Sequence, residues 1–128
     1  MNILLWIVQV LLAAVFLAHG LFLLMPPASM LEMMNAAIPP AFRIFLGIAE
    51  VLAGIGVIVP GVTRIQPRLV PLAAAGLIPI MIGATIFHIT RGETSSAVIT
   101  AVLLALLTFV TYERWKVRPI APRGRTVA

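Results

Sequence analysis

Four long apolar runs, separated by short polar or proline-containing segments, dominate the chain. They cover residues 3–24, 42–60, 69–90 and 95–112. A helix of about 20 residues crosses the hydrocarbon core of a bilayer, so each run is long enough to span it. Because the polar residues cluster between the runs, we predict an all-α fold, an integral membrane four-helix bundle.

A shorter segment lies between the first and second runs. Residues 25–27 end the first helix, because a proline disfavours helical geometry in the residue before it. Ser29 and Glu32 then have the spacing of a capping box, which predicts a short helix through Ala36. This helix is too short to span. We expect an interfacial helix that lies on the membrane surface or folds over the mouth of the bundle.

Proline, glycine and hydroxyl residues predict the other helix ends. The second span is expected to end at Pro60, and Pro79 should kink the third by removing one backbone hydrogen bond. Gly92 is expected to stop the third span in a left-handed conformation. Thr94 or Ser95 is the expected cap of the fourth span.

The composition agrees with a single membrane domain. Of the 128 residues, 62% are hydrophobic, more than a soluble domain of this size could bury. We assign residues 1–118 to the four-span domain and residues 119–128 to a basic cytoplasmic tail. The chain has no cysteine, which excludes disulfides and thiolate metal sites.

The net charge of +5 predicts an orientation and no nucleic-acid partner, because the basic residues flank the apolar runs. With four spans, both termini and the connection between the second and third spans share one side. The basic residues on that side are Arg64, Arg68, Arg114, Lys116, Arg118, Arg123 and Arg125. Only Arg43 and Arg91 lie on the other side. The positive-inside rule therefore predicts a multi-pass protein of the cell (inner) membrane, with both termini cytoplasmic.

An acidic residue, Glu50, lies near the centre of the second span. A carboxylate at that depth costs about 3 kcal/mol by insertion scales, so it should face protein or trapped water and have a partner. Arg43 lies two turns earlier on the same face, and Gly47 and Gly54 on that face let another helix pack closely. Alternatively, Glu50 is structural, neutral or paired with Arg43 or a histidine, and fixes the helix register.

Two histidines extend this group. In the predicted orientation His19, Arg43, Glu50 and His88 all lie in the outer half of the bundle, on three helices, whereas Gln9 is the comparable polar residue of the inner half. This asymmetry predicts a polar pocket open to the outside. Each residue also has a structural interpretation: Arg43 extends to the outer headgroups, His88 is interfacial at a helix end, and His19 bonds to another helix.

Metal and haem sites are not predicted. His19, His88 and Glu50 have side chains of the types that bind metals, but their helical spacing does not force them together. The same spacing gives no reason to place a haem between the two histidines.

Several motifs resemble the DoxX family of small four-helix membrane proteins over roughly residues 4–118. These motifs are Phe16-Leu-Ala-His-Gly20, Gly47-Ile-Ala-Glu-Val-Leu-Ala-Gly-Ile-Gly-Val-Ile-Val-Pro60, Leu72-Ala-Ala-Ala-Gly76 and His88. The chain departs from many relatives at Leu21 to Leu24, where they place a lysine. A charge interaction made there in those relatives is absent here.

The resemblance implies partners more than a reaction. Members of the family include a membrane subunit of thiosulfate–quinone oxidoreductases and partners of superoxide-detoxifying and sulfur-transfer enzymes. It therefore implies a non-catalytic subunit or anchor of a redox or stress-response complex, with the lipid bilayer and an extrinsic oxidoreductase or further copies of the chain as partners. A quinone near Glu50 and His88 is the candidate ligand, since it needs a donor and a proton acceptor in an apolar pocket.

Two other functions stay open. One is a small proton-coupled transporter or carrier, in which Glu50 titrates within the membrane and Pro79 supplies a flexible helix. The other is a structural assembly factor. The sequence shows no nucleophile–base set and no phosphate-binding loop, so we expect no catalysis by this chain alone.

Overall fold

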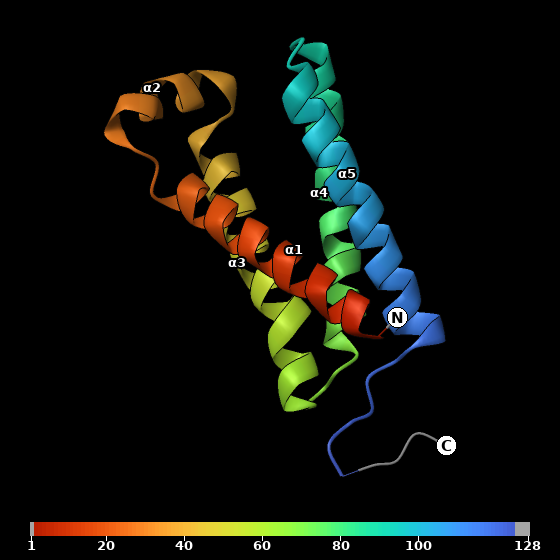
Figure 1. Cartoon of the computed structure of the whole chain (residues 1–128). Coiled ribbons are helices and arrows are strands. Elements are labelled where there is room, and N and C mark those ends of the chain that lie inside the picture. The colour runs from red at the N-terminus through yellow and green to blue at the C-terminus, as the bar shows by residue number, and fades with distance from the viewer. Residues whose placement is uncertain (1, 125–128) are drawn as a thin grey trace.

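A computed structural model describes residues 2–124, which are mainly helical (Figure 1). The elements are α1 (Asn2–Leu24), α2 (Ala28–Ala37), α3 (Pro40–Thr63), α4 (Leu69–Thr90), α5 (Thr94–Tyr112) and the π-helical turn η1 (Glu113–Val117) that continues α5. Within residues 2–124, four helices are long and apolar enough to cross a membrane: α1, α3, α4 and α5 with η1. The predicted helical membrane bundle is confirmed.

The helices form two pairs, α1 with α3 and α4 with α5, which α3 and α4 join. The pairs converge at the end that carries Asn2 and the segment after η1, here called the terminal end, and diverge toward the α2 end (Figure 1). The largest core cluster lies where they converge. It consists of Val8, Leu12, Phe16, Val57, Ala74, Leu77, Met81, Leu107 and Val110.

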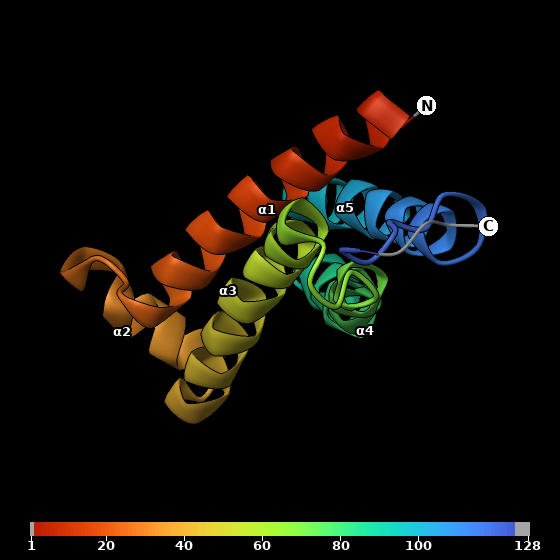
Figure 2. The ribbon, with the colours of Figure 1, turned by 90° about the horizontal axis from the view of Figure 1, so that it is seen from below.

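The backbones of α1 and α3, which cross obliquely (Figure 2), approach each other closely at two glycines. A Cβ atom added to Gly20 would lie 2.9 Å from the carbonyl oxygen of Gly47, and one added to Gly47 would lie 3.0 Å from that of Gly20. Gly54 lies in the same way against Leu17. The close packing expected at Gly47 and Gly54 is confirmed, and small residues allow it.

The α2 helix differs from the prediction at its start. Of its two expected positions, the one over the mouth of the bundle is wrong, and the one on the membrane surface stays a prediction. The helix begins at Ala28 with Pro27 as N-cap, whose carbonyl accepts the first backbone hydrogen bonds. Proline has no side-chain acceptor, so there is no side-chain cap. Ser29 thus lies inside the first turn, and the capping box with Glu32 is wrong. None of the residues of α2 is buried. It lies at the ends of α1 and α3, away from α4 and α5 (Figures 1 and 2), so it does not cover the mouth of the bundle.

The α3 helix does not end at Pro60. A proline removes one hydrogen bond from a helix but does not have to stop it, and α3 continues to Thr63 with Pro60 buried inside it. The helix ends at Arg64, which adopts the left-handed conformation with φ 59°.

At the turn between α4 and α5, one expectation is confirmed and one is wrong. Gly92 has φ +71°, as predicted for a left-handed stop. Neither Thr94 nor Ser95 caps α5. The N-cap is Glu93, without a side-chain cap, and its carbonyl accepts the backbone N–H of Ala97 at 2.9 Å.

We predict that Gly20→Ala lowers the free energy of unfolding by about 1–3 kcal/mol, the usual cost of overpacking. The new methyl group would meet the backbone of Gly47 and Val51, which cannot move aside as a side-chain tip can. The measurement is reversible unfolding in mixed detergent micelles, followed by circular dichroism.

Gly76→Ala is the matched control, since a Cβ atom there has nothing within 4 Å. Alanine is also the better helix former, so the control should be as stable as the wild type or slightly more stable. We call the contact of α1 with α3 at Gly20 and Gly47 the glycine crossing. An equal loss of unfolding free energy in both variants would show that this crossing is not the cause of the destabilisation.

Candidate functional site

The glycine crossing places His19 beside Glu50. His19 precedes Gly20 on α1, and Glu50 follows Gly47 by almost one turn on α3. The His19 Nδ1 atom lies 2.9 Å from Oε1 of Glu50. The Glu50 side chain is 2% exposed, whereas that of His19 is 53% exposed. Of the two partners expected for Glu50, Arg43 or a histidine, the structure therefore shows a histidine.

The hydrogen bond between Nδ1 of His19 and Oε1 of Glu50 can form in two ways. An ionised carboxylate accepts the Nδ1–H, and a protonated one donates its O–H to a neutral Nδ1. The second ring nitrogen of His19, Nε2, makes no hydrogen bond to any other side chain or backbone group in residues 2–124. The imidazole lies near the ring of Phe22, with 6.2 Å between centroids. The pair thus combines a buried carboxyl group with a half-exposed imidazole.

Arg43 lies on the same buried face of α3 but bonds to a different group. It is 6% exposed, and its Nη1 donates to the carbonyl oxygen of Leu23 in the last turn of α1. Such carbonyls lack a partner within their own helix and attract cations. The interpretation of Arg43 as a side chain that extends to the headgroups is wrong, and no ion pair joins it to Glu50 within residues 2–124.

His88 belongs to a separate cluster at the turn between α4 and α5. Its Nδ1 lies 3.0 Å from Oε1 of Glu93, and Nε of Arg91 donates to the same oxygen at 3.2 Å. Arg91 also lies over the ring of Phe87, 5.1 Å from its centroid. The two helix pairs diverge at this end (Figure 1). The four residues expected in one pocket are therefore separated: His19 and Glu50 form a pair, Arg43 bonds to the end of α1, and His88 bonds to Glu93.

Two hollows of the surface lie elsewhere. One of about 440 Å³ runs between α3 and α4 and is apolar, with small residues such as Ala53, Gly56 and Ala73 in its wall. Another, of about 550 Å³, lies at the terminal end. Within residues 2–124, no three His, Asp or Glu side chains are close enough to hold a metal ion.

The sequence pattern does not predict a buried polar network that lies at the terminal end. Arg114, its central residue, follows an apolar run, which is typical of an exposed flanking charge. Arg114 is 3% exposed, and it donates to Oε1 of Gln9 and to Oδ1 of Asn2, both at 2.7 Å. Gln9 donates in turn to the carbonyl oxygen of Val57 at 2.9 Å. Gln9 was the available signal, since an amide within an apolar span needs a partner.

The model of the DoxX-like family matches residues 7–110 of the chain. This match confirms the resemblance seen in the motifs around His19, Glu50 and Gly76. No curated protein and no solved structure matches the chain.

We predict that His88→Ala raises the pKa of Glu93. The hydrogen bond from His88 is the main reason that the pKa of this carboxyl lies below its ordinary value, and the charge of Arg91 lowers it further. A lowered pKa means that the contact contributes stability above the unfolded-state pKa, and that this contribution is lost as the pH falls through the folded-state pKa. The measurement is a carbon-13 NMR titration of labelled glutamate in micelles.

Arg91→Gln is the control for this titration. It removes a weaker cause, so the pKa of Glu93 should rise less than in His88→Ala. A pKa that stays unchanged in His88→Ala contradicts the assigned contact.

Proposed function

This chain belongs to the DoxX-like family, and we propose that it is a non-catalytic membrane subunit or anchor of a redox or stress-response complex. In this proposal the His19–Glu50 pair binds the head group of a quinone. The observation that carries the proposal is a buried carboxyl group, 2.9 Å from a half-exposed imidazole, within two membrane-spanning helices.

The chemistry of the pair suits this ligand. A quinone carbonyl needs a hydrogen-bond donor, and a hydroquinone hydroxyl needs an acceptor. Nε2 of His19 serves either need, because Glu50 can give a proton to Nδ1 or take one from it. Ligand sites of this kind are mostly apolar with a few placed polar groups, and the ring of Phe22 lies near the imidazole. The chain would position the quinone, and an extrinsic oxidoreductase would carry out the reaction.

We predict that gently purified wild-type protein retains quinone and that His19→Ala and Glu50→Gln retain about 2- to 12-fold less. A hydrogen bond between uncharged groups contributes about 0.5–1.5 kcal/mol, which corresponds to this range. The measurement is quinone per protein by mass spectrometry, which also identifies copurified proteins.

His88→Ala is the matched control, because His88 also lies toward the α2 end but bonds to Glu93. It should retain quinone as the wild type does. Wild-type retention in His19→Ala, or an equal loss in His88→Ala, would contradict the proposed site.

The His19–Glu50 pair also favours a second function, because it offers a path for a proton. One hydrogen bond links the buried carboxyl of Glu50 to the half-exposed ring of His19, as a small proton-coupled carrier would require. Proton flux into liposomes that disappears in Glu50→Gln, without quinone retention, would replace the first proposal by this one. Partner binding with neither quinone nor flux would leave an assembly factor.

We also propose that the protein lies in the inner membrane with both termini in the cytoplasm. The support is the positive-inside rule. Arg64, Arg68 and Arg123 line a hollow at the terminal end, and Arg125 lies outside the described residues.

Because the chain has no cysteine, a cysteine introduced by a single substitution is the only thiol of the variant. Its labelling therefore shows on which side of the membrane that position lies. In intact spheroplasts, an impermeant maleimide should label Ser95→Cys and spare Lys116→Cys. The reverse labelling would contradict this orientation.

A further inference from the structure

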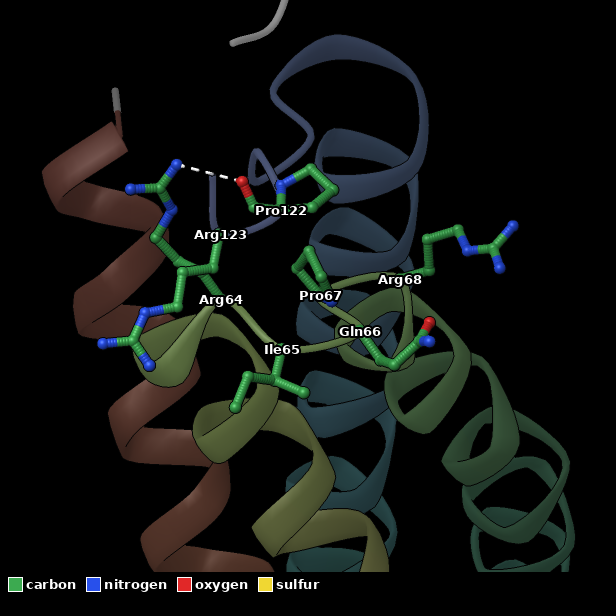
Figure 3. Close-up of a pocket in the computed structure, with 7 residues that line it drawn as sticks. All are labelled: Arg64, Ile65, Gln66, Pro67, Arg68, Pro122 and Arg123. Carbon is green, nitrogen blue, oxygen red and sulfur yellow. Dashed lines mark hydrogen bonds between the residues drawn. The ribbon is translucent and has the colours of Figure 1, made fainter. Parts of the chain in front are cut away.

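At the terminal end, the segment after η1 folds back onto the connection between α3 and α4 (Figure 3). The backbone N–H of Arg123 donates to the carbonyl oxygen of Arg64 at 2.8 Å. Arg64 donates in return from Nε to the carbonyl of Ala121 at 2.8 Å and from Nη2 to that of Pro122 at 3.2 Å. We call these three hydrogen bonds the clasp. They fix a basic segment against a basic loop, which charge repulsion alone would oppose.

The clasp encloses a hollow of about 550 Å³, bounded by residues 64–68, Pro122 and Arg123. Three of these seven residues are arginines, and no acidic residue lines the hollow among residues 2–124. Glu113 is an acidic residue near this end, but it does not line the hollow. Its Oε2 atom lies 4.0 Å from Nε of Arg118. The hollow therefore has an excess of positive charge that an anion would neutralise.

The arginines do not all point the same way. The guanidinium groups of Arg64 and Arg123 extend to the same side, beside α1, whereas Arg68 extends to the opposite side (Figure 3). Arg64 and Gln66 have φ values of 59° and 50°, which residues other than glycine adopt rarely. The clasp holds the loop in this conformation, and such backbone strain often accompanies binding sites.

The surroundings place the hollow at the level of lipid headgroups. It adjoins the ends of two spanning helices, α3 and α4. Val62 and Ile65 are exposed apolar side chains beside it. Trp6, an aromatic residue of the type that marks a membrane interface, lies against Gly61 one turn away. An anion that reaches the hollow from the bilayer would bring its acyl chains along α3.

We propose that this hollow binds the phosphate group of an anionic phospholipid, in the leaflet at the terminal end. Arg123 donates to the phosphate oxygens through its guanidinium fork, which matches their geometry and binds phosphate more specifically than an ammonium group does. Arg64, whose Nε and Nη2 atoms donate within the clasp, contributes its Nη1 group and its charge. Basic pockets between membrane helices recognise lipid headgroups in this way. The proposal depends neither on the quinone site nor on which leaflet faces the cytoplasm.

The test uses the full chain, purified in detergent and titrated with phosphatidylglycerol or with phosphatidylcholine of the same acyl chains. Native mass spectrometry gives the affinity for each lipid. We expect phosphatidylglycerol to bind more tightly and Arg123→Gln to weaken that binding about fivefold, the effect of one basic residue near a membrane surface. Phosphatidylcholine binding should not change.

Arg123→Gln keeps the backbone N–H that bonds to Arg64, so the clasp should persist. Hydrogen exchange of a peptide covering residues 119–124 verifies this. Arg123→Lys, which keeps the charge but loses the fork, should recover part of the affinity. The matched control is Arg68→Gln, which removes a charge from the opposite side of the hollow and should have a smaller effect.

Three results would overturn the proposal. The first is an unchanged phosphatidylglycerol affinity in Arg123→Gln, and the second is an equal loss in Arg68→Gln, which would indicate a diffuse charge effect. The third is displacement of phosphatidylglycerol by excess inorganic phosphate, because the ligand would then be free phosphate and not a lipid.

Discussion

The contact of α1 with α3 at Gly20 and Gly47 is the constraint on which the polar interior depends. Because neither residue has a side chain, each backbone approaches the other's carbonyl oxygen closely. His19 on one helix then reaches Glu50 on the other, and Arg43 reaches the end of α1. A wider separation would leave two ionisable groups in the membrane without partners, which is costly in a medium of low polarity.

The two ends of the bundle are stabilised differently. At the terminal end all four long helices meet, and the Arg114 network ties the start of α1 to η1. The π-helical turn changes the direction of its side chains relative to an α-helix, which accounts for an arginine that points inward from a basic segment. Toward the α2 end the helix pairs diverge. Polar residues there bond within their own pair, as Glu50 does with His19 and Glu93 with His88.

This asymmetry gives the protein two surfaces of different chemistry at different depths. The His19–Glu50 pair places a half-exposed imidazole beside a buried carboxyl group, which suits a neutral polar group on a lipid-soluble molecule. The hollow at the terminal end offers concentrated positive charge, which suits a phosphate. A membrane subunit that holds a lipid-soluble cofactor and is itself anchored by specific lipids would use both. Neither surface requires the chain to have a catalytic group of its own.

From the residue pattern alone, the four spans, the short helix after Pro27, the glycines Gly47 and Gly54 on one face of α3 and the family could be predicted. Each of these depends on local hydropathy, on backbone geometry or on motifs within a single helix. The pattern also indicated that Glu50 needs a partner. It did not indicate that the partner is His19 and not Arg43, that His88 pairs elsewhere, that Arg114 is buried, or that Arg123 returns to Arg64. These contacts join different segments of the chain, and they depend on how closely the helices approach and where the pairs diverge, which no periodicity within one helix encodes.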